Sequence, residues 1–261
     1  LRFAIRMSDP HCPYCAKCSA DSAHLARIAA ATRRFPFPKM KKALLPLLIA
    51  VSGLLYIYVI PDEPHLVKLL FKLIPMWLII AYAALRMPER KKVSHWLLLL
   101  GLMFCMFGDG LLEWFLVGLT AFLIGHLFYM SSFFAQWRFS VWRLLTIIPL
   151  ALYGAFVGGR VVDEVLADGD RTLAYAIAAY VAVILIMAWS AVMTGNVWAV
   201  LGGLLFTASD SILAWNRFVE DVAYSGPLIM LTYYAAQFLI AHSAASGDAR
   251  GSTPRFGMTA G

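Results

Sequence analysis

Residues 96–115 read WLLLLGLMFCMFGDGLLEWF, and residues 197–215 read VWAVLGGLLFTASDSILAW. Each stretch is long and apolar enough to cross a bilayer as a helix, which takes about 20 residues. Each also contains an aspartate near its middle or end, Asp109 in the first and Asp210 in the second. An ionisable group at the centre of a spanning helix costs roughly 2.5–3.5 kcal/mol on insertion scales. We therefore expect the two aspartates to face each other, to face a wet cavity, or to carry out chemistry.

The composition is typical of a polytopic membrane protein. The chain is 61% hydrophobic and 14% charged, and its mean hydropathy is +0.74. Soluble domains average about 45–50% apolar and about 25% charged residues. The net charge is +7, but the basic residues cluster in short connectors and form no long stripe, so we expect no nucleic-acid partner. The predicted fold class is all-α, a bundle of about eight transmembrane helices.

Eight stretches are predicted to span the membrane. They are residues 43–60, 66–85, 94–113, 114–135, 141–159, 172–193, 196–215 and 225–245. The third and fourth follow each other almost without a loop, and the sixth and seventh are separated by residues 194–196. Such tight joints predict antiparallel neighbours. The eight spans form a predicted catalytic domain over residues 40–246, between a disordered N-terminal extension, 1–39, and a disordered tail, 247–261.

Charges in the connectors predict the orientation of the spans. Basic residues lie before the first span, after the second and fourth spans, and in the tail, whereas the alternate connectors are acidic or mixed. Under the positive-inside rule, this bias places both termini in the cytosol. Asp109 and Asp210 then each lie about 21–22 Å from the cytosolic end of their helices, at about 1.5 Å per residue. Lys72 and Tyr233 reach a similar level on two other helices.

Seven further residues are candidates for binding a substrate. They are Lys72, His126, Tyr129, Asn216, Arg217, Tyr233 and Gln237. Lys72 is either a counter-ion for a carboxylate or a contact for a lipid head group. Arg217 either pairs with a phosphate group or extends from the end of its helix into the interface. The spacings of His126 to Tyr129 and of Tyr233 to Gln237 place each pair on one helix face.

The N-terminal extension contains three cysteines in the sequence CPYCAKC. Cys12, Cys15 and Cys18, with His11 or His24, would supply a Cys3His set for zinc. No second cysteine pair follows, so the spacing is only half of a usual zinc site. We favour a tail with reduced thiols and predict no metal site.

Five segments of the chain together resemble the TMEM86/YhhN family of lysoplasmalogenases. They are FKLIPMW (71–77), GDGLLEW (108–114), FLIGHLFY (122–129), LFTASDSILAWNRF (205–218) and TYYAAQFLIAHSA (232–244). The resemblance implies an eight-helix enzyme of the endoplasmic reticulum with no required cofactor. It implies hydrolysis of the vinyl ether bond of lysoplasmalogens to a fatty aldehyde and glycerophosphocholine or glycerophosphoethanolamine. The two family aspartates match Asp109 and Asp210.

Vinyl ether hydrolysis has a use for two carboxyl groups. A neutral acid must protonate the β-carbon of the double bond, and burial away from water favours the neutral form of a carboxyl group. A second carboxylate would stabilise the oxocarbenium ion and orient water, as in glycosidases. Two nearby acids titrate as a coupled pair, so the roles are open from sequence. We favour Asp109 as the acid.

Other classes of protein remain compatible with the same residues. A metal-dependent lipid hydrolase would use His126 with Asp109 and Asp210, since three ligands and a water suffice for catalytic zinc. A lipid or proton transporter also places carboxyl groups inside helices, although the sequence lacks the clear internal repeat of many transporters. A receptor or scaffold would keep its function after replacement of either aspartate by asparagine.

Overall fold

The computed structural model describes residues 41–61 and 63–246. The predicted extension 1–39, with its candidate zinc ligands, and the predicted tail 247–261 lie outside the described residues. One compact unit of the chain begins at Leu44. The described part of that unit consists of helices joined by turns and has no β-strand, which confirms the predicted all-α class.

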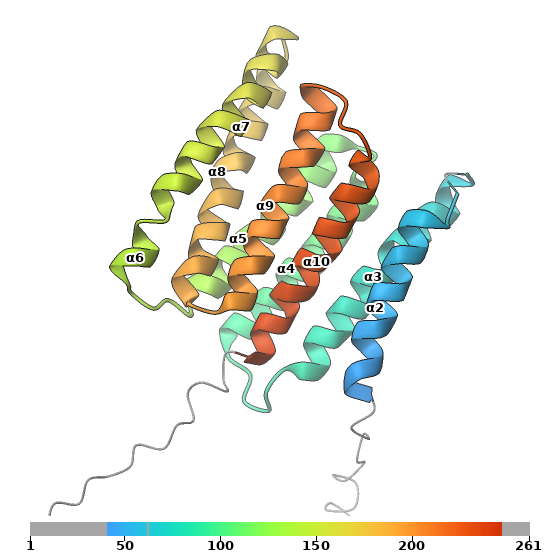
Figure 1. The fold of residues 1–261 in the computed structure, drawn as a ribbon, viewed down its shortest axis with the longest axis vertical. Helices are drawn as coiled ribbons and strands as arrows, with labels where there is room; N and C mark the ends of the chain where they lie inside the picture. Colours follow the sequence, from blue (N-terminus) through green and yellow to red (C-terminus); the bar gives the residue numbers. More distant parts are fainter. Residues whose placement is uncertain (1–40, 62, 247–261) are drawn as a thin grey trace, which may run out of the picture. The chain divides into compact units, whose positions relative to one another are not determined.

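The predicted spans all coincide with helices of the structure (Figure 1). The helices are α2 (Lys41–Tyr58), α3 (His65–Arg86), α4 (Val93–Leu111), α5 (Phe115–Phe134), α6 (Val141–Leu144), α7 (Ile147–Ala167), α8 (Arg171–Thr194), α9 (Val197–Phe218) and α10 (Ser225–Ser246). Within the described residues, six apolar segments are long enough to cross a membrane, namely α3, α4, α5, α6 with α7, α8 and α9. The chain is therefore an integral membrane protein. That α2 and α10 also cross the bilayer stays a prediction.

A proline divides the fifth predicted span into α6 and α7. Pro149 has no N–H group, and its ring crowds the carbonyl group of Leu145 four residues earlier. The helix is replaced here by a tighter turn, in which the Ile148 N–H group donates to the oxygen of Leu145, three residues earlier, at 3.1 Å. The two helices still form one apolar segment of 27 residues.

The same segment continues beyond residue 159, where the prediction ended it. Helix α7 reaches Ala167, and Arg160 pairs with Glu164 at 3.3 Å across one helical turn. Charged side chains that extend into water do not stop a helix, and such a pair supports it. The helix therefore ends eight residues beyond the predicted span.

Close antiparallel packing forms the bundle. Helix α4 packs along α5, and α9 packs along α10, while α8 lies against α5, α7 and α9. At the α4–α5 turn, a Cβ atom added to Gly118 would lie 2.7 Å from the Leu112 Cα atom, so only glycine allows the hairpin to close. The α8–α9 turn uses Gly195 at φ +67°, and Asn196 caps α9 by accepting from the Trp198 N–H group at 3.1 Å.

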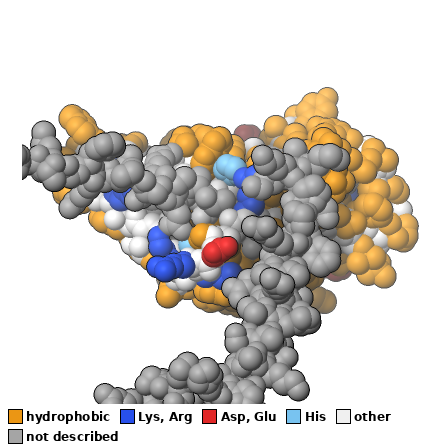
Figure 2. All heavy atoms as spheres, turned by 90° about the horizontal axis from the view of Figure 1, so that it is seen from below, with side chains coloured by type: hydrophobic (Ala, Val, Ile, Leu, Met, Phe, Trp, Pro, Cys, Tyr) orange, Lys and Arg blue, Asp and Glu red, His pale blue; other side chains and the backbone are white. Residues whose placement is uncertain are grey.

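Basic side chains gather at one end of the bundle. This end carries the α3–α4, α5–α6 and α8–α9 connections, at the bottom of Figure 1. Figure 2 views it from below and shows lysine and arginine side chains at its centre, between hydrophobic sides of the molecule. The alternate connectors lie at the opposite end. This charge asymmetry is the one that the connector sequences predict.

Candidate active site

A cavity inside the bundle brings the two aspartates together. The empty volume of the cavity is about 990 Å³, counted together with the open solvent at its entrance. Its lining residues belong to α3, α4, α5, α7, α8, α9 and α10. Most of the lining is apolar. The residues with polar side chains in the lining are Lys72, Asp109, Tyr153, Tyr180, Thr207, Ser209, Asp210, Ser211 and Tyr233. The expected meeting of Asp109, Asp210, Lys72 and Tyr233 in one polar layer is confirmed.

Asp109 is held by a cation and a hydroxyl group. The Lys72 ammonium nitrogen lies 3.4 Å from one carboxylate oxygen of Asp109 and donates to its main-chain oxygen at 3.3 Å. The Tyr233 hydroxyl donates to the other carboxylate oxygen at 2.6 Å. Only 3% of the Asp109 side chain and 14% of the Lys72 side chain are exposed. Of its two sequence interpretations, Lys72 therefore fits the counter-ion.

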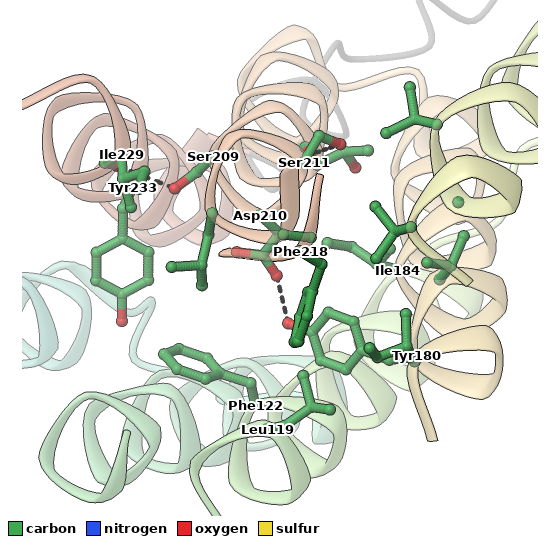
Figure 3. Close-up of a pocket in the computed structure, with 18 of the residues that line it drawn as sticks. Leu119, Phe122, Tyr180, Ile184, Ser209, Asp210, Ser211, Phe218, Ile229 and Tyr233 are labelled. Carbon is green, nitrogen blue, oxygen red and sulfur yellow. Dashed lines mark hydrogen bonds between the residues drawn. The ribbon is translucent and has the colours of Figure 1, made fainter. Parts of the chain in front are cut away.

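Asp210 has a different environment. The Tyr180 hydroxyl of α8 donates to its carboxylate (Figure 3). The neighbouring hydroxyls bond elsewhere, since Ser209 donates to the Ile229 oxygen at 2.9 Å and Ser211 to the Thr207 oxygen at 2.7 Å. Within residues 41–61 and 63–246, the ion pairs are Lys72–Asp109 and Arg160–Glu164, so Asp210 has no cationic partner there.

Sequence reasoning missed Tyr180. It is one of two tyrosines in the apolar stretch 172–193, and nothing in the sequence distinguishes it from Tyr175. The packing of α8 against α9 brings the Tyr180 hydroxyl to Asp210, and this packing cannot be read from the sequence of α8 alone. A buried tyrosine normally finds a hydrogen-bond partner, and this general rule was the one available signal.

His126, Tyr129 and Gln237 are fully buried but lie outside the cavity lining. Tyr129 donates to the Gln237 side-chain oxygen at 2.6 Å. The His126 ring packs against the rings of Phe206 and Tyr180, with centroids 4.5 and 5.3 Å away, and neither ring nitrogen makes a hydrogen bond with a described residue. None of the three lines the cavity. The structure thus places them behind its wall, not at the substrate contacts that their helix positions predicted.

Asn216 and Arg217 occupy the last turn of α9. The Asn216 side-chain oxygen accepts from the Val222 N–H group at 2.9 Å, so this residue shapes the α9–α10 turn. Its role as a substrate contact stays a prediction. The exposed Arg217 guanidinium lies 4.3 Å from the centroid of the Phe115 ring. Phe115 and Phe218 both line the cavity. Arg217 therefore lies at the edge of the cavity and remains available to an anionic group.

A metal-dependent lipid hydrolase would need His126 to lie beside Asp109 and Asp210 so that all three could bind one metal ion. The His126 ring lies outside the cavity lining. No group of three or more histidine, cysteine, aspartate or glutamate side chains suited to a metal ion occurs among the described residues. The described residues therefore do not fit the catalytic metal set that the sequence left open.

The fold and the cavity define a helical membrane protein with two aspartates, one buried and one half-buried, in the lining of a mostly apolar cavity. Residues 67–244 match the YhhN family, and the chain belongs to this family. No solved structure matches the chain.

Relatives of the chain have names that describe an enzyme. Lysoplasmalogenase TMEM86B of Mus musculus is 29% identical over 211 residues, which cover 80% of this chain and 88% of the mouse protein. Its Sus scrofa counterpart is 30% identical over 209 residues, covering 77% of this chain and 86% of the pig protein. Lysoplasmalogenase TMEM86A of Bos taurus is 35% identical over 159 residues, 55% of this chain and 63% of the bovine protein. The resemblance predicted from the motifs is confirmed.

Replacing Tyr180 by phenylalanine should impair activity and leave the fold intact. The change removes the hydroxyl group that holds Asp210, and hydrogen bonds to charged groups contribute about 1.5–3 kcal/mol, or about ten- to hundredfold in rate. Tyr175→Phe is the matched control, because it makes the same chemical change at an exposed position of the same helix. Aldehyde release from lysoplasmalogen is the measurement. Equal rates in the two variants would show that the Tyr180–Asp210 contact is irrelevant to activity.

Proposed function

We propose that the protein is a lysoplasmalogenase, a membrane hydrolase that cleaves the vinyl ether bond of a lysophospholipid. The products are a fatty aldehyde and glycerophosphocholine or glycerophosphoethanolamine. The observation that carries this proposal is the pair of carboxyl groups with unequal surroundings in the lining of one mostly apolar cavity. The names of the relatives support it. An apolar cavity fits the hydrocarbon chain, and the carboxyl groups fit the acid chemistry of the ether.

Asp210 is the proton donor in this proposal. The Lys72 ammonium group stabilises the ionised form of Asp109, whereas Asp210 has a hydroxyl partner and no cation among the described residues. A neutral Asp210 gives its proton to the β-carbon of the vinyl ether. The double-bond electrons form the new C–H bond, and the ether oxygen shares the positive charge. This assignment reverses the one favoured from sequence, because the sequence does not show which aspartate pairs with Lys72.

Asp109 stabilises the resulting cation. The negative carboxylate offsets the charge of the oxocarbenium ion, as the second carboxylate does in glycosidases. Water then adds to the cationic carbon and loses a proton, which restores the acid and gives a hemiacetal. The hemiacetal collapses to the aldehyde and the free glycerol hydroxyl. One water molecule is consumed, and no other reactant is needed.

Arg217 binds the phosphate of the head group in this proposal. Its guanidinium lies against the Phe115 ring at the cavity edge. Lys72 is engaged by Asp109 and is not assigned this role.

We also propose that the protein resides in the endoplasmic reticulum membrane with both termini in the cytosol. The basic end of the bundle supports the orientation under the positive-inside rule (Figure 2). A glycosylation acceptor inserted between α9 and α10 would be glycosylated in this orientation and unmodified in the opposite one.

Replacing either aspartate by asparagine should abolish most of the activity. Asparagine keeps the shape of the side chain and removes the acid and the charge, and general acid catalysis contributes about 10²–10⁴-fold in rate. Asp163→Asn, at an exposed position of α7, is the matched control. Aldehyde release by purified protein is the readout. Wild-type rates in Asp210→Asn, or an inactive wild-type protein, would contradict the proposed function.

A double-mutant cycle with Lys72→Met shows through which of the two aspartates Lys72 affects the rate. If Lys72 acts by keeping Asp109 ionised, adding Lys72→Met to Asp109→Asn should cause little further loss. Added to Asp210→Asn, the same change should reduce the residual rate again, because Asp109 is still present to lose its counter-ion. The opposite pattern would show that Lys72 acts on a group other than Asp109, and would contradict the proposed counter-ion role.

Replacing Arg217 by leucine should raise KM for lysoplasmalogen by about tenfold with little change in kcat. The guanidinium contacts the head group equally in the ground state and the transition state, so its loss weakens binding alone. Arg171→Leu removes the same charge at the start of α8, at the same end of the bundle, and serves as the control. Unchanged KM in Arg217→Leu would remove the head-group assignment.

A further inference from the structure

The two tyrosines that hold the aspartates come from different helices. Tyr180 of α8 donates to Asp210, and Tyr233 of α10 donates to Asp109 at 2.6 Å. Both tyrosines line the cavity and are labelled in Figure 3. Helix α8 packs against α5, α7 and α9, whereas α10 packs against α3, α4 and α9. What lies between the two phenol rings therefore decides how their hydroxyl groups are placed relative to each other.

Two fully buried rings connect these tyrosines. His126 of α5 and Phe206 of α9 have ring centroids 4.5 Å apart at an interplanar angle of 74°. The His126 ring meets the Tyr180 ring at 5.3 Å and 82°, and the Phe206 ring meets the Tyr233 ring at 5.5 Å and 86°. Aromatic pairs prefer such edge-to-face contacts, with centroids about 4.5–7 Å apart. We call His126 and Phe206 the buried ring pair.

The buried ring pair does not belong to the cavity lining. Neither His126 nor Phe206 is among the lining residues. The two ring nitrogens of His126 make no hydrogen bond with a described residue. The contribution of His126 is therefore the shape and packing of its ring. Any effect of the pair on the reaction must pass through the tyrosines that it contacts.

We propose that the buried ring pair fixes the two tyrosine hydroxyl groups, and through them the spacing of the two carboxyl groups. This inference rests on the proposed function. His126 is a positioning residue for Tyr180 and the aspartate that it holds. Phe206 is a positioning residue for Tyr233 and its aspartate. The contact between His126 and Phe206 joins the two halves of the site.

The spacing matters because the two carboxyl groups act on neighbouring atoms of one substrate. The acid must reach the β-carbon of the vinyl ether while the carboxylate lies beside the adjacent cationic carbon. A misplacement of about 1 Å can reduce a rate about hundredfold. A tyrosine side chain turns about two torsions, so its hydroxyl group is fixed only where neighbours hold the ring. The buried ring pair holds both tyrosine rings without occupying the space of the substrate.

Replacing His126 by leucine tests the first half of the pair. Leucine is similar in volume but has no ring, so the change should reduce kcat about tenfold and leave KM within about twofold. His126→Phe restores a ring and should recover most of the lost kcat. Phe133→Leu is the control, because it removes a fully buried ring of the same helix that stacks on Tyr129. It should keep both constants.

Double-mutant cycles distinguish positioning from a general disturbance of the fold. In a Tyr180→Phe background no hydroxyl group is left to position, so His126→Leu should reduce kcat little further. In a Tyr233→Phe background the same change should still cost about tenfold. Phe206→Leu should show the reverse dependence on the two backgrounds. It also decides the question should His126→Leu fail to fold.

Binding of a saturated alkyl ether lysophosphatidylcholine, which lacks the vinyl double bond, reports folding separately from catalysis. Retained binding with reduced kcat is the expected result for His126→Leu and Phe206→Leu. The proposal is overturned if their losses are equal in both tyrosine backgrounds, or if His126→Phe is as slow as His126→Leu. A wild-type protein that releases no aldehyde would refute the proposed function. Normal release by the wild type with background-independent losses would refute the role of the ring pair alone.

Discussion

The ion pair between Lys72 and Asp109 is the contact on which the arrangement of the site depends. An unpaired charge in the low-dielectric core of the bundle carries a large desolvation cost, and breaking a buried pair typically costs about 3–5 kcal/mol. The pair, together with the hydroxyl of Tyr233, ties α3, α4 and α10 to one point. It also makes the two aspartates unequal. One carboxylate has a cationic partner, and the other has a hydroxyl partner.

The helix connections explain why these groups meet. Helices α4 and α9 run in the same direction, since each begins at the basic end and ends at the opposite one. Asp109 and Asp210 lie at similar distances from the starts of their helices, so they reach the same level of the bundle. Glycine at the α4–α5 turn and at the α8–α9 turn lets the neighbouring helices return closely. Most of the remaining lining residues are apolar.

The level of each site residue along the bundle could be predicted from the sequence. The direction in which its side chain points could not. A constant rise per residue converts a position in a helix into a level in the membrane, and this correctly grouped Lys72, Asp109, Asp210 and Tyr233. Rotation about each helix axis depends on packing. His126 and Gln237 therefore lie behind the cavity wall, where Phe206 and Tyr180 cover the His126 ring. No sequence pattern on α8 identified Tyr180, because its hydrogen-bond partner Asp210 lies on α9.

Transfer of a proton to carbon is the central chemical claim, and isotope labelling tests it most directly. Lysoplasmalogen is hydrolysed in D2O, and the aldehyde is reduced at once to the alcohol so that later exchange does not occur. Protonation by a fixed carboxyl group predicts one deuterium on the carbon next to the former carbonyl, delivered to a single face. An alcohol without deuterium at that carbon would show that the ether is cleaved by another route and would contradict the account.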